Sequence, residues 1–256
     1  MRFRLNISYD GTAYHGWAAQ NNLPTVQQTL ENAIFSIIRE NIEIFCAGRT
    51  DAGVHAVGQV AHLDLDQNNI KKVLGNSDRE IESTLLYKLN SLLPEVIVIN
   101  QVLPVNASFD ARRSAKSRIY KYFISNDVGH RLPQSLRFCL KEDTPLDVEK
   151  MNHEAKTLLG RNDFYSFIKG RPGQTTIRDL ERFEFKKNLS NGYIVATIQA
   201  NAFAHNMVRC LIGASLLVGK GQRDSGWLYQ SMIDKKRKAS LGPASAKGLF
   251  LYKVIY

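Results

Sequence analysis

The sequence predicts an α+β fold of two halves, each with the order β-α-β-β-α-β, which is the ferredoxin-like order. Three observations predict it: strand-like alternation at both ends of the chain, apolar residues at helical spacing between the strands, and a loose repeat of this order in the second half. We expect the halves to join into one mostly antiparallel sheet flanked by helices. With 44% hydrophobic and 23% charged residues, the 256-residue chain can bury a real core.

The first half covers residues 1–105. Its opening strand alternates Phe3, Leu5 and Ile7 on one face, and Gly11 follows as a breaker. Thr25 begins a segment with capping-box spacing, which predicts the start of a helix. The expected elements of this half are a strand at 2–9, a helix from Thr25, strands at 43–47 and 59–65, a helix opened by 77–80 and stopped at Pro94, and a strand at 96–102.

The second half covers residues 106–256 and repeats the order with insertions. Its most apolar segment, 204–218, predicts a buried helix that ends at Gly219. The other expected elements are strands at 118–125, 178–186, 193–200 and 249–256, and helices at 147–159 and 227–235.

The charge is divided unevenly between these halves. Residues 1–105 hold 8 Lys/Arg and 11 Asp/Glu, a net charge of −3, whereas residues 106–256 hold 26 and 13, a net charge of +13. A half this basic favours a polyanion partner, because each neutralised phosphate releases condensed counterions. The alternative is a basic surface with no partner. Basic residues interleaved with tyrosines between Arg112 and Tyr122 favour nucleic acid, since such a segment can hold a backbone and stack a base.

Several classes of protein are disfavoured. Three widely spaced cysteines predict neither a disulfide framework nor a cysteine zinc site. The six histidines lack metal-ligand spacing, no phosphate-loop or serine-hydrolase motif is complete, and no apolar run is long enough for a membrane span. We therefore expect a cytoplasmic protein with no metal and no cofactor.

One segment combines chemistry-bearing residues with glycines. Residues 47–56 read Ala-Gly-Arg-Thr-Asp-Ala-Gly-Val-His-Ala directly after a predicted strand. Glycines allow sharp turns and close ligand approach, and a nearby Arg49 keeps Asp51 ionised, ready to act as a nucleophile or base. The alternative interpretation is a turn aspartate that binds its own backbone amides.

This segment resembles the signature of the TruA family of tRNA pseudouridine synthases over nine consecutive residues, Gly48 to Ala56. The resemblance runs the length of the chain. Further matching segments are 9–17, 25–27, 109–112, 118–122, 163–164, 166–167, 205–209 and 248–249. Three positions depart from the family pattern: Ala18 replaces a Gln, Ala204 a larger apolar residue, and Asn206 a second His.

The resemblance implies the pseudouridine synthase fold and an isomerase that breaks the N1–C1′ bond of uridine and rejoins the base through C5. It implies that Asp51 is the catalytic aspartate, whether it attacks the sugar, attacks the base or first takes a proton. Tyr120 matches the tyrosine that stacks on the target base, with Tyr122 as second choice and a core tyrosine as the alternative. Because side chains alternate along a strand, we then expect Ile119 to face the core. Arg209 matches the basic partner of the aspartate, and Arg49 is expected to fill space or hold phosphate when the uridine flips out.

The implied substrate is the tRNA anticodon stem-loop, at uridines 38, 39 and 40, and the implied assembly is a homodimer with no membrane association. Two alternatives remain: a synthase of this fold that acts on another RNA, and a non-catalytic RNA-binding protein. The joint presence of Asp51, Tyr120 and Arg209 disfavours the second, because binding RNA alone needs no carboxylate near phosphates.

Overall fold

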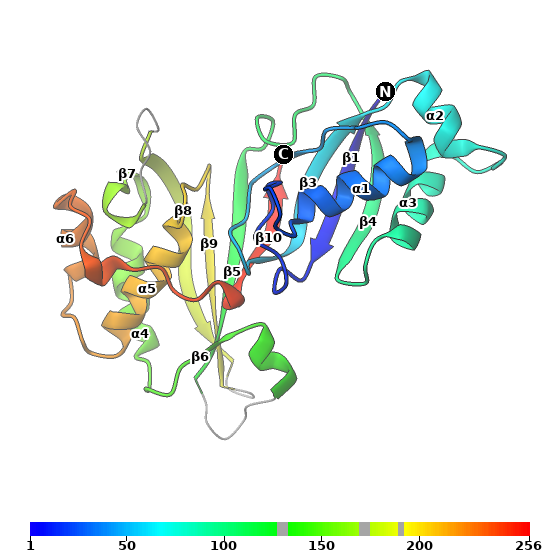
Figure 1. Ribbon diagram of the computed structural model, residues 1–256. Coiled ribbons are helices and arrows are strands. Elements are labelled where there is room, and N and C mark those ends of the chain that lie inside the picture. The colour runs from blue at the N-terminus through cyan, green and yellow to red at the C-terminus, as the bar shows by residue number, and fades with distance from the viewer. Residues whose placement is uncertain (127–132, 169–174, 189–191) are drawn as a thin grey trace. The chain divides into compact units, whose positions relative to one another are not determined.

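The computed structural model describes residues 1–126, 133–168, 175–188 and 192–256 (Figure 1). The chain divides into two compact units. Unit 1 comprises Met1–Lys116 together with Leu251–Tyr256, and unit 2 comprises Ser117–Phe250.

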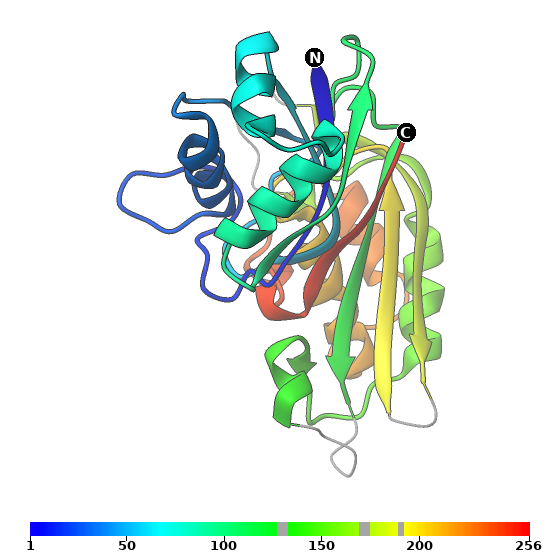
Figure 2. The same ribbon diagram turned by 90° about the vertical axis from the view of Figure 1, so that its right-hand side faces the viewer.

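Unit 1 is a sheet with helices on one face. Its strands lie in the order β4-β1-β3-β10, and the short β2 pairs with β3. The pairs β1/β3, β1/β4 and β2/β3 are antiparallel. Helices α1 and α3 lie side by side against this sheet in both views (Figures 1 and 2). The elements are β1 (Arg2–Tyr9), α1 (Val26–Ile38), β2 (Phe45–Cys46), β3 (His55–Asp64), α2 (Gln67–Leu74), α3 (Ile81–Leu92), β4 (Ile97–Val105) and β10 (Leu249–Ile255).

The core of unit 1 follows from the two sequence periodicities. Every second residue of β1 is buried, including Phe3, Leu5 and Ile7, because a strand sends alternate side chains to opposite faces. Helix α1 buries residues at helical spacing, such as Leu30 and Ile34. Thr25 caps α1 by accepting a hydrogen bond from the Gln28 N–H, so the expected helix start is confirmed.

Two helical details of unit 1 differ from the sequence prediction. Helix α2 was not expected, because its eight residues are mostly polar and only Asn69 and Val73 are buried. The signals that could have revealed it are the Asp66 cap, which accepts the Asn69 N–H, and the two lysines in its last turn. Helix α3 begins at Ile81 rather than within 77–80, and its N-cap residue Glu80 makes no side-chain capping bond.

Unit 2 has its own run of paired strands and its own helices. Its strands lie in the order β5-β9-β8-β7, and β6 pairs with β5 in the parallel direction. The pairs β5/β9, β8/β9 and β7/β8 are antiparallel. The elements are β5 (Ser117–Ser125), β6 (Leu140–Lys141), α4 (Val148–Thr157), β7 (Gly160–Asp163), β8 (Ile177–Lys187), β9 (Tyr193–Ala200), α5 (Met207–Gly219) and α6 (Trp227–Ile233).

The central helix of unit 2 starts later than predicted. Helix α5 begins at Met207, not at Ala204, because Asn206 has φ 61° and ψ 0° in the left-handed region. A residue in that region cannot continue a right-handed helix, and Asn tolerates it better than most residues. The remaining thirteen residues of α5 are nearly all buried, as the apolar segment predicted.

The described residues therefore form a mixed α/β fold, with a mostly antiparallel sheet and six flanking helices, and the predicted fold class is confirmed. Strands β6 and β7 in the second half were not predicted from the sequence. The division at residue 105, which was expected from the charge, remains a proposal. Within the described ranges, no helix is both long and apolar enough to cross a membrane.

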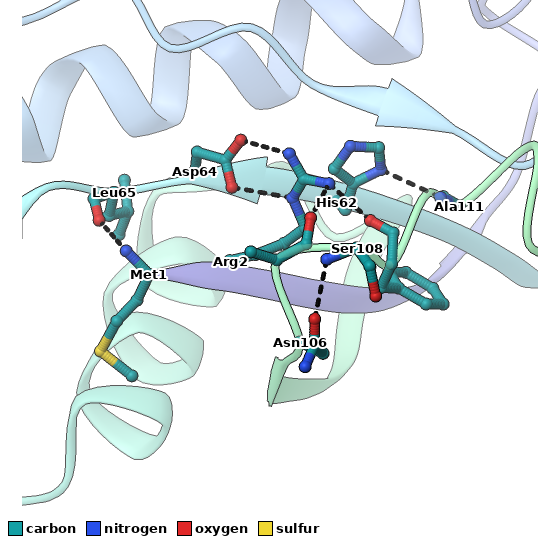
Figure 3. Close-up of polar contacts among 10 residues, drawn as sticks. Met1, Arg2, His62, Asp64, Leu65, Asn106, Ser108 and Ala111 are labelled. Carbon is teal, nitrogen blue, oxygen red and sulfur yellow. Dashed lines mark hydrogen bonds and ion pairs between the residues drawn. The ribbon is translucent and has the colours of Figure 1, made fainter.

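A polar cluster at the start of β1 fixes the segment that carries Arg112 and Arg113 (Figure 3). Arg2 forms a bidentate ion pair with Asp64, at 2.8 and 2.6 Å. The same guanidinium donates to the carbonyls of Ala107 and Phe109, at 2.8 and 2.7 Å. Segment 106–113 is thereby tied to both β1 and β3.

His62 on β3 completes this attachment. Its side chain is buried, stacks on the ring of Phe45 at 5.2 Å, and accepts the Ala111 N–H at Nδ1, 3.1 Å away (Figure 3). Burial lowers the pKa of His62 below its ordinary 6.5, the Arg2 cation lowers it further, and the carboxylates of Asp110 and Asp64 oppose the shift. A neutral His62 therefore fits this position.

Acidification should weaken the fold through His62. Because its folded-state pKa is depressed, the unfolded chain takes up a proton first, so its contribution is complete above about pH 6.5 and is lost as the pH falls through the folded-state pKa. His62→Gln keeps an acceptor for Ala111 but does not titrate. We expect a smaller loss of unfolding free energy from pH 7 to pH 5 in this variant, measured by urea denaturation.

The exposed His153 on α4 supplies the control for that measurement. His153→Gln should lose as much stability as the unmodified protein over the same pH range. Equal pH dependence in His62→Gln and His153→Gln would show that His62 does not carry the effect.

Candidate active site

Asp51 lies on the loop between β2 and β3, within the signature segment. Thr50 is buried, the Asp51 side chain is partly exposed, and Arg49 is exposed. The loop turns at Asp51, whose carbonyl accepts the Val54 N–H at 3.1 Å. Gly53 takes φ 75° in this turn, a conformation that glycine adopts without strain.

A second loop, residues 10–17, supports the Asp51 loop from β1. The Trp17 N–H donates to the Thr50 carbonyl at 3.0 Å, and the Gly53 N–H donates to the Tyr14 carbonyl at 3.2 Å. These two bonds hold the backbone on both sides of Asp51. They also join segments 9–17 and 48–56, which both match the family pattern.

Buried side chains reinforce the same loop from the sheet. The hydroxyl oxygens of Tyr9 and Thr50 share a hydrogen bond of 2.7 Å. The Gln59 side-chain amide donates to the Gly48 carbonyl at 2.8 Å. Tyr9, Thr50 and Gln59 are buried, with exposures of 4%, 7% and 0%.

His55, the signature histidine, is a loop-forming residue. Its side chain is fully buried, and its Nδ1 accepts the Gly11 N–H at 3.1 Å. An Asp10 carboxylate oxygen also lies 3.1 Å from Nδ1. His55 therefore joins the start of β3 to the start of the 10–17 loop.

Arg49 projects from the loop and belongs to a positive environment. No hydrogen bond or ion pair of its side chain occurs among the described residues. Burial raises the pKa of the neighbouring Cys46 thiol to about 12, and the cations of Arg49 and Arg112 oppose this rise. Arg49 and Arg112 therefore both act on the Cys46 thiol.

Tyr120 and Arg209, the other predicted site residues, belong to unit 2. Tyr120 lies on β5 opposite Ile198 of β9, is 8% exposed, and packs edge-to-face against Phe203 with the centroids 5.1 Å apart. We expected Ile119 to face the core, but Ile119 is only partly buried while Tyr120 is buried. Strand alternation assigns the buried face of β5 to the even-numbered residues.

Tyr122, the second-choice tyrosine, has a structural role. It is fully buried, its hydroxyl donates to the Ser245 carbonyl at 2.8 Å, and its ring leaves no room for a side chain at Gly248. Burial raises the pKa of Tyr122 above its ordinary value, and the Arg209 cation opposes the rise. Tyr122 therefore helps to hold the loop at Ser245, next to the Ala244 carbonyl that binds Arg209.

Arg209 is held in place by its own helix and by the loop after α6. Its Nε donates to the Ala244 carbonyl at 2.7 Å, and its Nη1 donates to the Asn206 side-chain oxygen at 3.2 Å. Asn206, one of the three departures from the family pattern, thus both precedes α5 in a left-handed conformation and orients Arg209. The pairing of Arg209 with Asp51 remains a prediction, as do the roles of all four site residues.

Among the residues that the structure describes, no three His, Cys, Asp or Glu side chains come together as metal ligands. The chemistry available at the two sets of residues is that of a carboxylate, a tyrosine and arginine cations.

Comparisons with known proteins decide the family. A family model described as tRNA pseudouridine synthase matches residues 6–110 and 155–256. The chain belongs to the tRNA pseudouridine synthase family. All of it aligns with proteins named tRNA pseudouridine synthase A: one from Streptomyces griseus at 40% identity over 88% of that protein, one from Corynebacterium glutamicum at 39% over 89%, and one from Bifidobacterium longum at 36% over 93%.

Membership of the tRNA pseudouridine synthase family confirms the resemblance drawn from the sequence and the expected isomerase class. The sequence patterns did not identify Tyr9 and Gln59, whose side chains bind the Asp51 loop. Tyr9 stood inside a matching segment and Gln59 inside a predicted strand, but which loop their polar groups bind depends on strand pairing. Periodicity alone could not reveal that.

Gly16 should be essential to the loop pair. It has φ 93°, and a Cβ there would lie 2.6 Å from the Thr50 carbonyl oxygen. We expect Gly16→Ala to lower the unfolding free energy by about 2–4 kcal/mol through backbone strain and steric overlap. Chemical denaturation checks this value.

Gly160 provides a matched control, because its φ of 90° is close to that of Gly16, but a Cβ there meets nothing within 4 Å. Gly160→Ala should cost about 1–2 kcal/mol, the backbone contribution alone. Equal losses in the two variants would contradict a close approach between Gly16 and the Asp51 loop.

Proposed function

We propose that the protein converts uridine to pseudouridine at positions 38, 39 and 40 of the tRNA anticodon stem-loop, with Asp51 as the nucleophile. The observation that carries this proposal is the placement of Asp51. Its side chain is partly exposed, while the backbone on both sides of it is held by hydrogen bonds from Trp17 and to Tyr14. A carboxylate on such a rigid support is already positioned for reaction.

The isomerisation needs no added atoms. The N1–C1′ bond of uridine breaks, the uracil turns, a C5–C1′ bond forms, the C5 proton leaves, and N1 takes up a proton. A carboxylate suits this chemistry because it can attack as a nucleophile and can stabilise positive charge that develops at C1′. The neutral isostere asparagine can do neither well.

The remaining site residues act on the substrate in this proposal. The edge-to-face contact of Tyr120 with Phe203 fixes a ring on which the target base can stack. The exposed guanidinium of Arg49 can occupy the space left by the flipped uridine or hold its phosphate. Arg209, oriented by Ala244 and Asn206, supplies a cation for pairing with the catalytic carboxylate.

The charge distribution supports tRNA as the partner. The +13 net charge of residues 106–256 favours a polyanion, and Arg112 and Arg113 are exposed at its start. Their backbone is anchored, because the Asp110 side chain accepts both of their N–H groups, at 2.8 and 2.7 Å. Those bonds hold the pKa of Asp110 below its ordinary value, so the anchor persists at neutral pH.

A homodimer and a cytoplasmic location belong to the same proposal. The dimer follows from the family resemblance, and sedimentation of the purified protein distinguishes a dimer mass from a monomer mass. The three cysteines are all free thiols, which suits a reducing compartment. Activity on another RNA, or binding without catalysis, are the competing functions.

Asp51→Asn should abolish conversion. We expect pseudouridine formation in an unmodified tRNA with uridines at 38–40 to fall by at least about a thousand-fold, because the nucleophile is lost. Tight tRNA binding should persist. The measurement is chemical mapping of pseudouridine at single-nucleotide resolution, with tRNA affinity determined in parallel.

Asp78→Asn is the matched control, because Asp78 is an exposed aspartate of unit 1 outside the site. It should retain activity. Conversion of other RNAs but not this tRNA would favour the other-RNA alternative. Intact binding with no conversion by the unmodified protein, across all RNAs tested, would favour the binding-only alternative.

The arginine segment should contribute to binding electrostatically. Replacing Arg112 and Arg113 together by Ala should weaken tRNA binding and reduce the slope of log affinity against log salt by about 1–2. Fluorescence anisotropy between 50 and 300 mM salt checks this slope. The control replaces the exposed Lys71 and Arg79, in the acidic half, by Ala. An equal change of slope in the control would show that only net charge matters.

A further inference from the structure

We infer that Tyr9 and Gln59 are positioning residues for Asp51, which they hold through the backbone of the signature loop; this inference rests on the proposed function of Asp51. Neither residue carries a role in the resemblance or in the proposed mechanism. Both lie on strands, and both direct a buried polar group at the same loop.

The strand register explains why these two side chains act together. Gln59 on β3 pairs with Ile7 on β1, so Gln59 points to the same face as Ile7 and Tyr9. The register shifts between Ile7 and Tyr9, and Tyr9 pairs with Ala56, which leaves an extra residue on β3. Such a bulge re-aims side chains and is common beside active sites.

The contacts then form one connected network. The Gln59 amide reaches the Gly48 carbonyl at 2.8 Å and the Tyr9 hydroxyl at 3.4 Å. The Tyr9 hydroxyl bonds the Thr50 hydroxyl at 2.7 Å. The network therefore restrains Gly48 and Thr50, on either side of Arg49, and Thr50 is the residue directly before Asp51.

Burial gives the network its strength. Tyr9, Thr50 and Gln59 are shielded from water, so a lost partner leaves a buried polar group without its bond. The loop backbone would then shift to find another partner. A shift of about 1 Å in a reacting group can cost about a hundred-fold in rate, because the reaction depends on aligned atoms.

The test removes the hydroxyl pair without removing the side chains. In Tyr9→Phe and Thr50→Val, we expect kcat for pseudouridine formation to fall by about ten-fold to a hundred-fold, with tRNA affinity unchanged. Thr50→Ser keeps a hydroxyl and should restore kcat to within about three-fold of the unmodified protein. The double variant Tyr9→Phe with Thr50→Val should be no worse than Tyr9→Phe alone, because the bond that Thr50→Val removes is already lost in Tyr9→Phe.

Thr84→Val controls for the loss of a buried hydroxyl as such. Thr84 is buried in α3, and its hydroxyl lies 3.4 Å from that of Ser77, outside the loop network. This variant should keep kcat unchanged even if its thermal stability falls as much as that of Tyr9→Phe. A matching fall in kcat for Thr84→Val would overturn the positioning role.

Amide hydrogen exchange supplies a readout that does not need activity. In Tyr9→Phe, the amides of Trp17, Gly53 and Val54 should exchange faster, whereas those that pair β1 with β4 should not. Faster exchange with unchanged kcat would show a structural restraint only and overturn the inference, as would unchanged exchange.

Activity and hydrogen exchange, measured together, separate the two proposals. If Asp51→Asn abolishes activity but Tyr9→Phe leaves kcat intact, the proposed function stands and the positioning role is wrong. If the unmodified protein converts no RNA, the proposed function and the catalytic meaning of the network both fail. Exchange at the loop amides still decides whether the hydroxyl pair fixes Asp51.

Discussion

The organisation of unit 1 depends on buried polar groups that two loops share. One loop follows β1, and the other precedes the adjacent strand β3. The loop after β1 and the loop before β3 present their backbone N–H and C=O groups to each other, and Thr50 takes part with both its carbonyl and its hydroxyl. A buried backbone group without a partner is costly, so each loop requires the other. Asp51 can then be partly exposed while the backbone on both sides of it is held by hydrogen bonds.

This arrangement requires the backbones of the two loops to approach each other closely. The two loops come near enough that Gly11 and Gly16 have no room for a Cβ against the backbones of Val54 and Thr50. Gly58 likewise has no room for a Cβ, because the backbone of Tyr252 is too close where β10 lies beside β3. Glycines in this part of the chain therefore serve contact between backbones as well as chain flexibility.

Unit 2 follows a different rule, because its polar site residues lie on otherwise apolar elements. Arg209 is a cation on the apolar helix α5, and its hydrogen bonds to Ala244 and Asn206 compensate its partial burial. The Tyr122 hydroxyl donates a hydrogen bond to the Ser245 carbonyl, in the same loop. The loop after α6 thus supplies carbonyl acceptors to both residues and helps to orient them.

The sequence by itself determined most of the strand and helix order, the helix cap at Thr25, the Asp51 segment and the family, because these are encoded in local periodicity and in consecutive residues. It placed the start of α5 too early and missed α2, since a single left-handed residue and a short polar helix change the periodicity little. Only the tertiary structure decided that Tyr9 and Gln59 bind the loop that carries Asp51 and that Tyr122 is a core residue. Those assignments depend on the register between strands and on which polar groups are buried together, and residues 50 positions apart in the chain carry no local sign of either.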